Sequence, residues 1–234
     1  MADKGIIFSA PMVRALLDGR KTQTRRLLKP KGGLPAPVNL AAHGVGTYSG
    51  EDSDPASWGW PFAEDGSDAS LALFPDLSGY APGDRLYVRE AWRTNSMWDA
   101  RSGAELASEN AQFGRVSLHY DADGASAANS CEREGCGRYR HARFMPRWAS
   151  RLWLEVTEVR VQRVREISET DAIAEGCVPN DGSLNPNYIG PAISIFSHLW
   201  NRLHTKPGET WQDNPWIVAI SFKVHTGNID GSQA

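Results

Sequence analysis

The chain has 234 residues, of which 41% are hydrophobic and 23% are charged, so it can bury a core and is not disordered throughout. Its formal net charge of -3 at pH 7 excludes a uniformly basic nucleic-acid coat protein, although cations clustered on one surface still attract phosphates. Three cysteines do not make a disulfide framework, and no apolar run is long enough for a membrane helix. Because the N-terminus lacks a secretory pattern, we expect a cytoplasmic protein without a membrane partner.

The first elements are a strand, a helix and a second strand. The apolar run "GIIFSA" predicts a short strand, and "SAPMVRALLDG" predicts a helix that begins after Ser9 and ends at Gly19. Met12, Ala15 and Leu16 recur at helical spacing and give this helix one apolar face. The alternation in "TQTRRLL" then predicts a strand that begins at about Thr22.

Two polar insertions interrupt the middle of the chain. Residues 31–82 are rich in Gly, Pro, Ser, Asp and Ala, which predicts little regular structure, and residues 94–139 are polar and rich in Ala, Ser and Gly. Between the insertions, "GDRLYVREAWR" predicts a turn followed by a strand.

The last third contains the clearest periodic patterns. "RLWLEVTEVRVQRV" predicts a long strand with a bend near Glu158, and "ISETDAIAEG" predicts a short helix capped by Ser168. A second amphipathic helix over "PAISIFSHLWNRLH" and a buried strand over "PWIVAISFKV" follow, before a tail at about residues 226–234 that we expect to be flexible. This order predicts a single α+β domain over residues 1–234, built as a small mixed β-barrel flanked by short helices.

The segment "GRKTQTRR" carries the densest group of chemically active side chains. A solvated basic turn, a grip on phosphates, and a catalytic lysine with a neighbouring threonine all fit this composition. Side chains alternate along a strand, so Lys21 and Thr24 can act together only if Lys21 lies in the turn before the strand begins.

Several motifs in order resemble the ASCH domain family, which shares a PUA-like β-barrel with RNA-binding domains. The resemblance rests on "FSAPMVRALLDGRKTQTRR", "GDRLYVREAW", "RWASRLWLEVTEVRVQRVREISETDAIAEG", "LWNRLH" and "NPWIVAISF". It covers about half of the chain, misses both insertions, and is strongest to phage and prophage members of the family.

The resemblance implies a nucleoside-recognising protein and a set of catalytic residues. A small bacterial member of the family is an amidohydrolase that removes acetyl from N4-acetylcytidine, and its motif matches Lys21, Thr24 and Glu175 here. By this analogy Thr24 is the nucleophile, Lys21 is the base, and Glu175 orients the lysine or transfers the proton.

A second hypothesis is a module that binds RNA or another single-stranded nucleic acid without chemistry. In it, phosphates and bases contact the remaining candidate residues, which are Arg20, Arg25, Arg26, Arg89, Glu90 and Trp92. A metal-independent ribonuclease is a third hypothesis, but the segments "GRKTQTRR", "VREAW" and "AIAEG", which would form its site, contain no histidine that would serve as its general base.

The second insertion contains a cysteine–histidine pattern. Cys131, Cys136 and His141 are separated by two four-residue gaps in "CEREGCGRYRH", which is compatible with a zinc knuckle or with free thiols. A fourth ligand is not evident, so no cofactor is expected.

Overall fold

The structure is a computed structural model, and it describes residues 3–28, 38–39, 58–61, 71–73, 79–124, 135–178 and 190–233. The described strands are β1 (Asp3–Ile7), β2 (Gln23–Leu27), β3 (Val38–Asn39), β4 (Trp58–Pro61), β5 (Leu71–Leu73), β6 (Arg85–Arg89), β7 (Trp92–Arg93), β8 (His119–Tyr120), β9 (Leu152–Arg163) and β10 (Trp216–Thr226). The described α-helices are α1 (Ala10–Leu17), α3 (Gly103–Phe113), α5 (Glu169–Ala174) and α6 (Ala192–Leu203). This mixture of helices and strands confirms the predicted α+β class.

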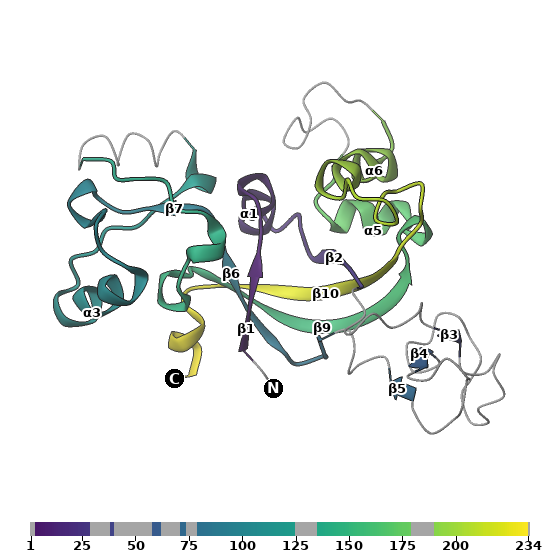
Figure 1. Cartoon of the computed structure of the whole chain (residues 1–234), viewed down its shortest axis with the longest axis horizontal. Coiled ribbons are helices and arrows are strands. Elements are labelled where there is room, and N and C mark those ends of the chain that lie inside the picture. The colour runs from purple at the N-terminus through teal and green to yellow at the C-terminus, as the bar shows by residue number, and fades with distance from the viewer. Residues whose placement is uncertain are drawn as a thin grey trace. The chain divides into compact units, whose positions relative to one another are not determined.

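Five of the strands form one mixed sheet, in the order β1-β6-β9-β10-β2 (Figure 1). β1 runs parallel to β6, whereas β6 runs antiparallel to β9 and β2 runs antiparallel to β10. Within the described residues this sheet ends at β1 and β2, so it is an open sheet and not a closed barrel. β3, β4 and β5 form a separate antiparallel sheet inside the first predicted insertion, most of which lies outside the described residues.

The chain forms two compact units, each assembled from stretches that are distant in sequence. Unit 1 comprises Met1–Lys21, Asp84–Glu155 and Lys223–Ala234, and unit 2 comprises Thr22–Gly83 and Val156–Phe222. Both β9 and β10 cross from one unit to the other. Along β9, burial alternates up to Val156 and changes phase at the exposed residues Thr157 and Glu158, which is where the sequence predicts a bend.

The first helix of unit 1, α1, begins and ends as its sequence predicts. Ser9 is the N-cap residue of α1, and the side chains of Met12, Val13, Ala15 and Leu16 are buried. Gly19 has a φ of 70°, a left-handed conformation that glycine adopts readily and that stops the helix. The backbone N–H groups of Arg20 and Lys21 both donate to the carbonyl of Ala15, so Lys21 belongs to this turn and precedes β2.

The second predicted insertion contains a helix and part of a core. Helix α3 starts with a capping box between Ser102 and Glu105, and it ends at Gly114 in the left-handed conformation. Leu106 is its buried residue, and it belongs to a hydrophobic cluster with Trp92, Val116, Met145 and Ala149. Unit 1 therefore has its own core beside the sheet.

A buried ion pair lies at the end of β6 in unit 1. Glu90 is 1% exposed, and Arg151 donates two hydrogen bonds to its carboxylate, at 2.9 and 3.0 Å. Arg151 also lies 2.8 Å from Asp123 and stacks over the ring of Tyr120. Burial raises the pKa of Glu90 above its ordinary value, and the hydrogen bonds and charge of Arg151 only partly oppose this shift. Burial likewise raises the pKa of Tyr120 to about 12.

Replacing Glu90 by glutamine is expected to remove one source of pH dependence from the stability of the protein. A carboxyl group whose pKa is raised on folding stabilises the fold below its unfolded pKa, here 4.5, and that contribution is lost as the pH rises through the folded pKa. The free energy of unfolding of the wild type should therefore fall, relative to that of Glu90→Gln, between about pH 4 and pH 7. Urea unfolding of both proteins at pH 4 and at pH 7 measures this difference. If the wild type instead becomes more stable relative to Glu90→Gln as the pH rises, the pKa of Glu90 is not raised on folding.

Unit 2 is built around α5, α6 and the strands beside them (Figure 1). Its hydrophobic core consists of Val164, Ile167, Ala172, Cys177, Ala192, Ile195, Phe196, Trp200, Ile217 and Ala219. Ser168 caps α5 as predicted, because its hydroxyl accepts a hydrogen bond from the backbone N–H of Asp171 at 3.0 Å. The carboxylate of Glu169, the first residue of α5, accepts hydrogen bonds from the first two backbone N–H groups of α6, so the N-termini of the two helices are joined.

Candidate functional site

The segment before and within β2 is buried, although its sequence is strongly polar. Lys21, Gln23, Thr24 and Arg25 are each between 1% and 5% exposed, and Glu175 is 4% exposed. Charged side chains are seldom so fully buried unless they are paired or functional. A solvated basic turn is therefore not the explanation of this segment.

Thr24 lies on β2 in unit 2 and pairs in register with Ile220 of β10. Because side chains alternate along a strand, Gln23 and Arg25 face one side of β2 and Thr24 faces the other. All three residues are buried, so both faces of β2 are covered at this point.

Arg25 holds the carboxylates of α5. Its side chain is 0% exposed, and its guanidinium lies 3.2 Å from Glu175 Oε1 and 3.1 Å from Asp171 Oδ2. It also donates to Gln23 Oε1 at 2.5 Å, and it lies over the ring of Phe196 at 5.8 Å. A guanidinium that is buried against two carboxylates is not presented to an external phosphate.

Glu175 is fixed in position by the helix that it follows. It is the C-cap residue of α5, and its backbone N–H donates to the carbonyl of Asp171 at 2.9 Å. The backbone N–H of Thr22 donates to the carbonyl of Ala174 at 2.9 Å, so the start of β2 is joined to the end of α5. These backbone bonds explain how Glu175 and Arg25 come within contact distance.

Asp171, which lies one helical turn before Glu175, also contacts the guanidinium of Arg25. Its carboxylate lies 3.1 Å from Arg160 as well as 3.1 Å from Arg25. Burial alone would raise the pKa of Asp171, but the charges of Arg25 and Arg160, with hydrogen bonds from Arg160 and Gln23, outweigh it and hold the pKa below its ordinary value. Asp171, Gln23 and Arg160 are not among the residues predicted from the sequence, although the four-residue spacing of Asp171 and Glu175 on one helix face is a readable signal.

Lys21 is the last residue of the first stretch of unit 1. It is 1% exposed, and its ammonium nitrogen lies 5.7 Å from the centroid of the Phe8 ring. It precedes β2, as a joint role with Thr24 requires, and only two residues separate it from Thr24 in the chain.

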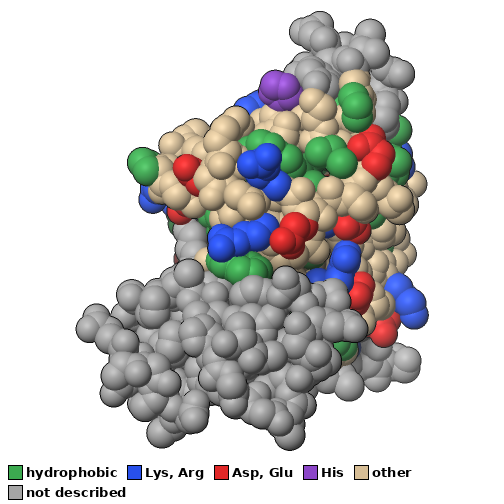
Figure 2. Space-filling view, turned by 90° about the vertical axis from the view of Figure 1, so that its right-hand side faces the viewer, with side chains coloured by type: hydrophobic (Ala, Val, Ile, Leu, Met, Phe, Trp, Pro, Cys, Tyr) green, Lys and Arg blue, Asp and Glu red, His purple; other side chains and the backbone are tan. Residues whose placement is uncertain are grey.

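The other arginines of the segment differ in their surroundings. Arg20 pairs with Asp18 at 2.8 Å on the surface. Burial lowers the pKa of Arg26, against the opposing charges of Tyr80 and Glu175. Figure 2, which looks onto the side where α5 and α6 lie, shows basic and acidic side chains interspersed in the described part.

Arg89, Glu90 and Trp92 are engaged inside unit 1. Arg89 donates to the carbonyl groups of Met145 and Arg143, and Glu90 is paired with Arg151. Trp92 is 1% exposed and packs in the hydrophobic core, so its ring is not a platform for a base.

The predicted cysteine–histidine pattern is only partly described. Cys131 lies outside the described residues, Cys136 is disulfide-bonded, and Cys177 is a buried free thiol. The disulfide at Cys136 differs from both the zinc thiolate and the free thiol considered from the sequence. Among the residues that the structure describes, no group of three or more His, Cys, Asp or Glu side chains is arranged to hold a metal ion.

Comparisons of the chain with protein-family models, with curated proteins and with solved structures find no match in any of the three. In the described part of the chain, no helix has both the length and the apolar character that crossing a membrane requires.

Proposed function

We propose that the chain is a nucleoside-recognising hydrolase of the ASCH type that removes an N-acyl group from a modified base such as N4-acetylcytidine. The observation that supports this proposal is the burial of Glu175 and of Lys21 and Thr24, the last two in a segment whose composition alone favours solvent exposure. A binding module that only grips phosphates needs its cations at the surface, whereas acyl transfer needs a nucleophile and a base shielded from water.

The proposed reaction assigns one role to each residue. The hydroxyl of Thr24 adds to the acyl carbon, and the neutral amine of Lys21 takes the hydroxyl proton. The tetrahedral intermediate collapses and the C–N bond breaks. Glu175 relays the proton from Lys21 to the nitrogen that leaves with the base, which restores the neutral amine of Lys21. Water then hydrolyses the acyl-threonine, which releases the carboxylic acid and restores the hydroxyl group.

The contacts of Arg25 add a supporting role to this mechanism. By holding the carboxylate of Glu175 at 3.2 Å, Arg25 fixes the group that transfers the proton. We also propose that the open five-stranded sheet is the described part of a PUA-like barrel, since its long strands β9 and β10 lie next to each other as the central strands.

The proposal is tested by measuring acetate released from N4-acetylcytidine and a small panel of N-acyl nucleosides. We expect turnover by the wild type, and a loss of about 10³-fold or more in Thr24→Ala and in Lys21→Ala. The matched control is Arg202→Ala, an exposed arginine on α6 that should leave turnover unchanged. Absence of turnover on every substrate, with salt-sensitive binding to single-stranded RNA or DNA retained, would favour the binding module instead.

A further inference from the structure

A short loop of unit 1 combines cations with aromatic rings. Residues 137–145, "GRYRHARFM", contain three arginines, one histidine and no acidic residue. We refer to this segment as the 137–145 loop. It lies outside the residues to which the proposed hydrolysis assigns a role.

Hydrogen bonds join the backbone of the 137–145 loop to neighbouring segments of unit 1. Arg140 and Trp92 exchange backbone hydrogen bonds at 3.1 and 2.9 Å, and the N–H of Gly137 donates to the carbonyl of Thr94 at 3.0 Å. The carboxylate of Asp99 accepts from the backbone N–H of Arg138 at 2.8 Å. A Cβ atom at Gly137 would lie 2.4 Å from that Thr94 carbonyl, so the close approach requires glycine.

Two side chains of the loop point inward and anchor it. Arg140 is 9% exposed, lies over the ring of Trp92 at 5.2 Å, and donates to the carbonyl of Trp98 at 3.0 Å. Met145 is buried in the same cluster as Trp92, and Arg89 donates to its carbonyl at 3.1 Å. Buried side chains therefore hold the loop at its middle and at its C-terminal end.

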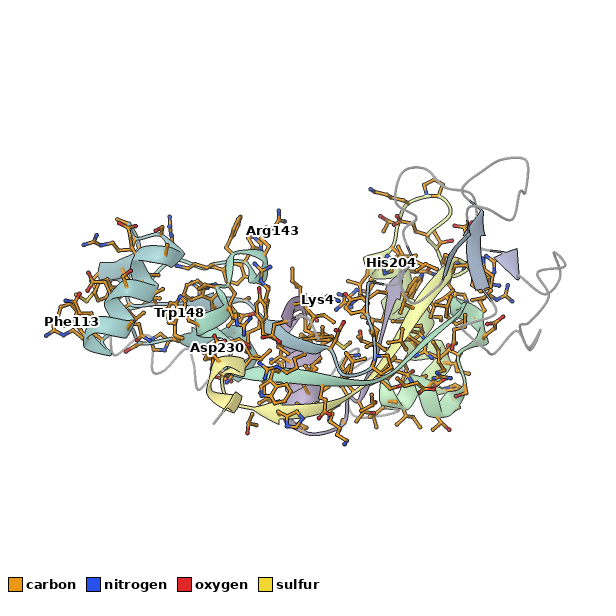
Figure 3. All side chains as sticks on the ribbon, turned by 90° about the horizontal axis from the view of Figure 1, so that it is seen from below. Lys4, Phe113, Arg143, Trp148, His204 and Asp230 are labelled. Carbon is orange, nitrogen blue, oxygen red and sulfur yellow. The ribbon has the colours of Figure 1, made fainter. Side chains whose placement is uncertain are left out.

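The remaining large side chains of the loop point into solvent. Tyr139 is 43% exposed and Phe144 is 66% exposed, and Arg138, His141 and Arg143 are exposed as well. The guanidinium of Arg93 lies over the Tyr139 ring at 5.3 Å, and that of Arg143 lies over the Phe144 ring at 5.7 Å. Figure 3 shows the side chain of Arg143 directed away from the ribbon.

We propose that the 137–145 loop binds single-stranded nucleic acid, with phosphates on Arg138 and Arg143 and with unpaired bases stacked on Tyr139 and Phe144. Cations attract the phosphate backbone, and exposed planar rings stack on bases of any sequence. Because bases inside a duplex are already stacked and paired, the rings add affinity only for single strands. An acidic peptide would satisfy the cations and leave both rings in water, so it fits the loop less well.

The test measures the binding of a fluorescein-labelled 20-nucleotide single-stranded RNA by fluorescence anisotropy at 50 and 200 mM salt. In Tyr139→Ala/Phe144→Ala we expect Kd to rise about tenfold or more for the single strand, with little change for a duplex of equal length. In Arg138→Ala/Arg143→Ala we expect weaker binding to both the single strand and the duplex. For the single strand, the slope of the logarithm of the binding constant against the logarithm of the salt concentration should become shallower by about 0.7 for each phosphate that an arginine no longer neutralises.

The matched control is Phe113→Ala/Arg115→Ala, which removes another exposed arginine–phenylalanine pair of unit 1, with the guanidinium 4.8 Å from the ring centroid. Its Kd should equal that of the wild type.

The proposal is overturned if the wild type does not bind, if the control loses as much affinity as the loop variants, or if polyglutamate or anionic vesicles bind as tightly as the RNA. Circular dichroism of each variant confirms that the fold is intact. Hydrolysis of a free nucleoside is assayed separately, so failure of the loop proposal is distinguishable from failure of the proposed activity.

Discussion

Replacing Arg25 by alanine is expected to lower the free energy of unfolding by about 3–5 kcal/mol, the range for removing one partner of a buried ion pair. The carboxylates of Glu175 and Asp171 both lie within 3.2 Å of the Arg25 guanidinium, whose side chain is fully buried. In the variant Asp171 retains Arg160 at 3.1 Å, and the buried carboxylate of Glu175 loses the guanidinium that lies 3.2 Å from it. Because the side chain of Glu175 is 5% exposed and that of Asp171 is 18% exposed, most of the decrease in stability should arise at Glu175.

Urea unfolding, followed by tryptophan fluorescence and circular dichroism, measures this change. The matched control is Arg20→Ala, which removes an arginine five residues earlier whose pair with Asp18 is on the surface and contributes at most about 1 kcal/mol. Arg25→Lys keeps the positive charge but lacks the planar guanidinium that contacts both carboxylates. The stability of this variant should therefore lie between those of the wild type and Arg25→Ala. An Arg25→Ala protein as stable as Arg20→Ala would show that the carboxylates do not depend on Arg25.

The stability difference between the wild type and Arg25→Ala should also depend on pH. The pKa of Asp171 is held below its ordinary value of 3.8 by Arg25 and Arg160, against the effect of burial. A group whose pKa is lowered on folding stabilises the protein above its unfolded pKa, and this stabilisation is lost as the pH falls through the folded pKa. The difference in stability between the wild type and Arg25→Ala should therefore shrink as the pH is lowered below about 4.

The elements with strong periodicity and clear caps could be predicted from the sequence. Helix α1 with Gly19, helix α5 with Ser168, and the long strand β9 are all found where their patterns indicate. Helix α3 was not predicted, although Ser102, Glu105 and Gly114 are ordinary start and stop signals. The reason is physical: Leu106 is its one buried residue, so the helix has no apolar stripe to reveal its period.

For the candidate site, the sequence indicated the residues but not their surroundings. Lys21, Thr24 and Glu175 were identified by resemblance, whereas their burial depends on tertiary packing that no local pattern encodes. The contact between Arg25 and Glu175 joins residues that are 150 positions apart, so it could not be inferred from spacing. The sequence therefore suggested that Arg25 contacts phosphates, and the structure pairs it with internal carboxylates instead.

Removing Lys21 and Thr24 together is expected to reduce kcat/KM for N4-acetylcytidine no further than removing either residue alone. In the proposed mechanism the two residues act in one step, since the lysine amine only accepts the proton that the threonine hydroxyl gives up. A base without its nucleophile, or a nucleophile without its base, then contributes little, and single losses of about 10³-fold do not multiply.

A double-mutant cycle with Lys21→Ala, Thr24→Ala and the double variant measures this coupling. The comparison cycle pairs Thr24→Ala with Arg202→Ala, an exposed residue of α6 for which the effects should be independent. If the losses from Lys21 and Thr24 instead multiply, the two residues act in separate steps, and Lys21 binds or positions the substrate rather than serving as the base. Because the double variant is judged against the single variants, the result does not depend on which acyl nucleoside is turned over fastest.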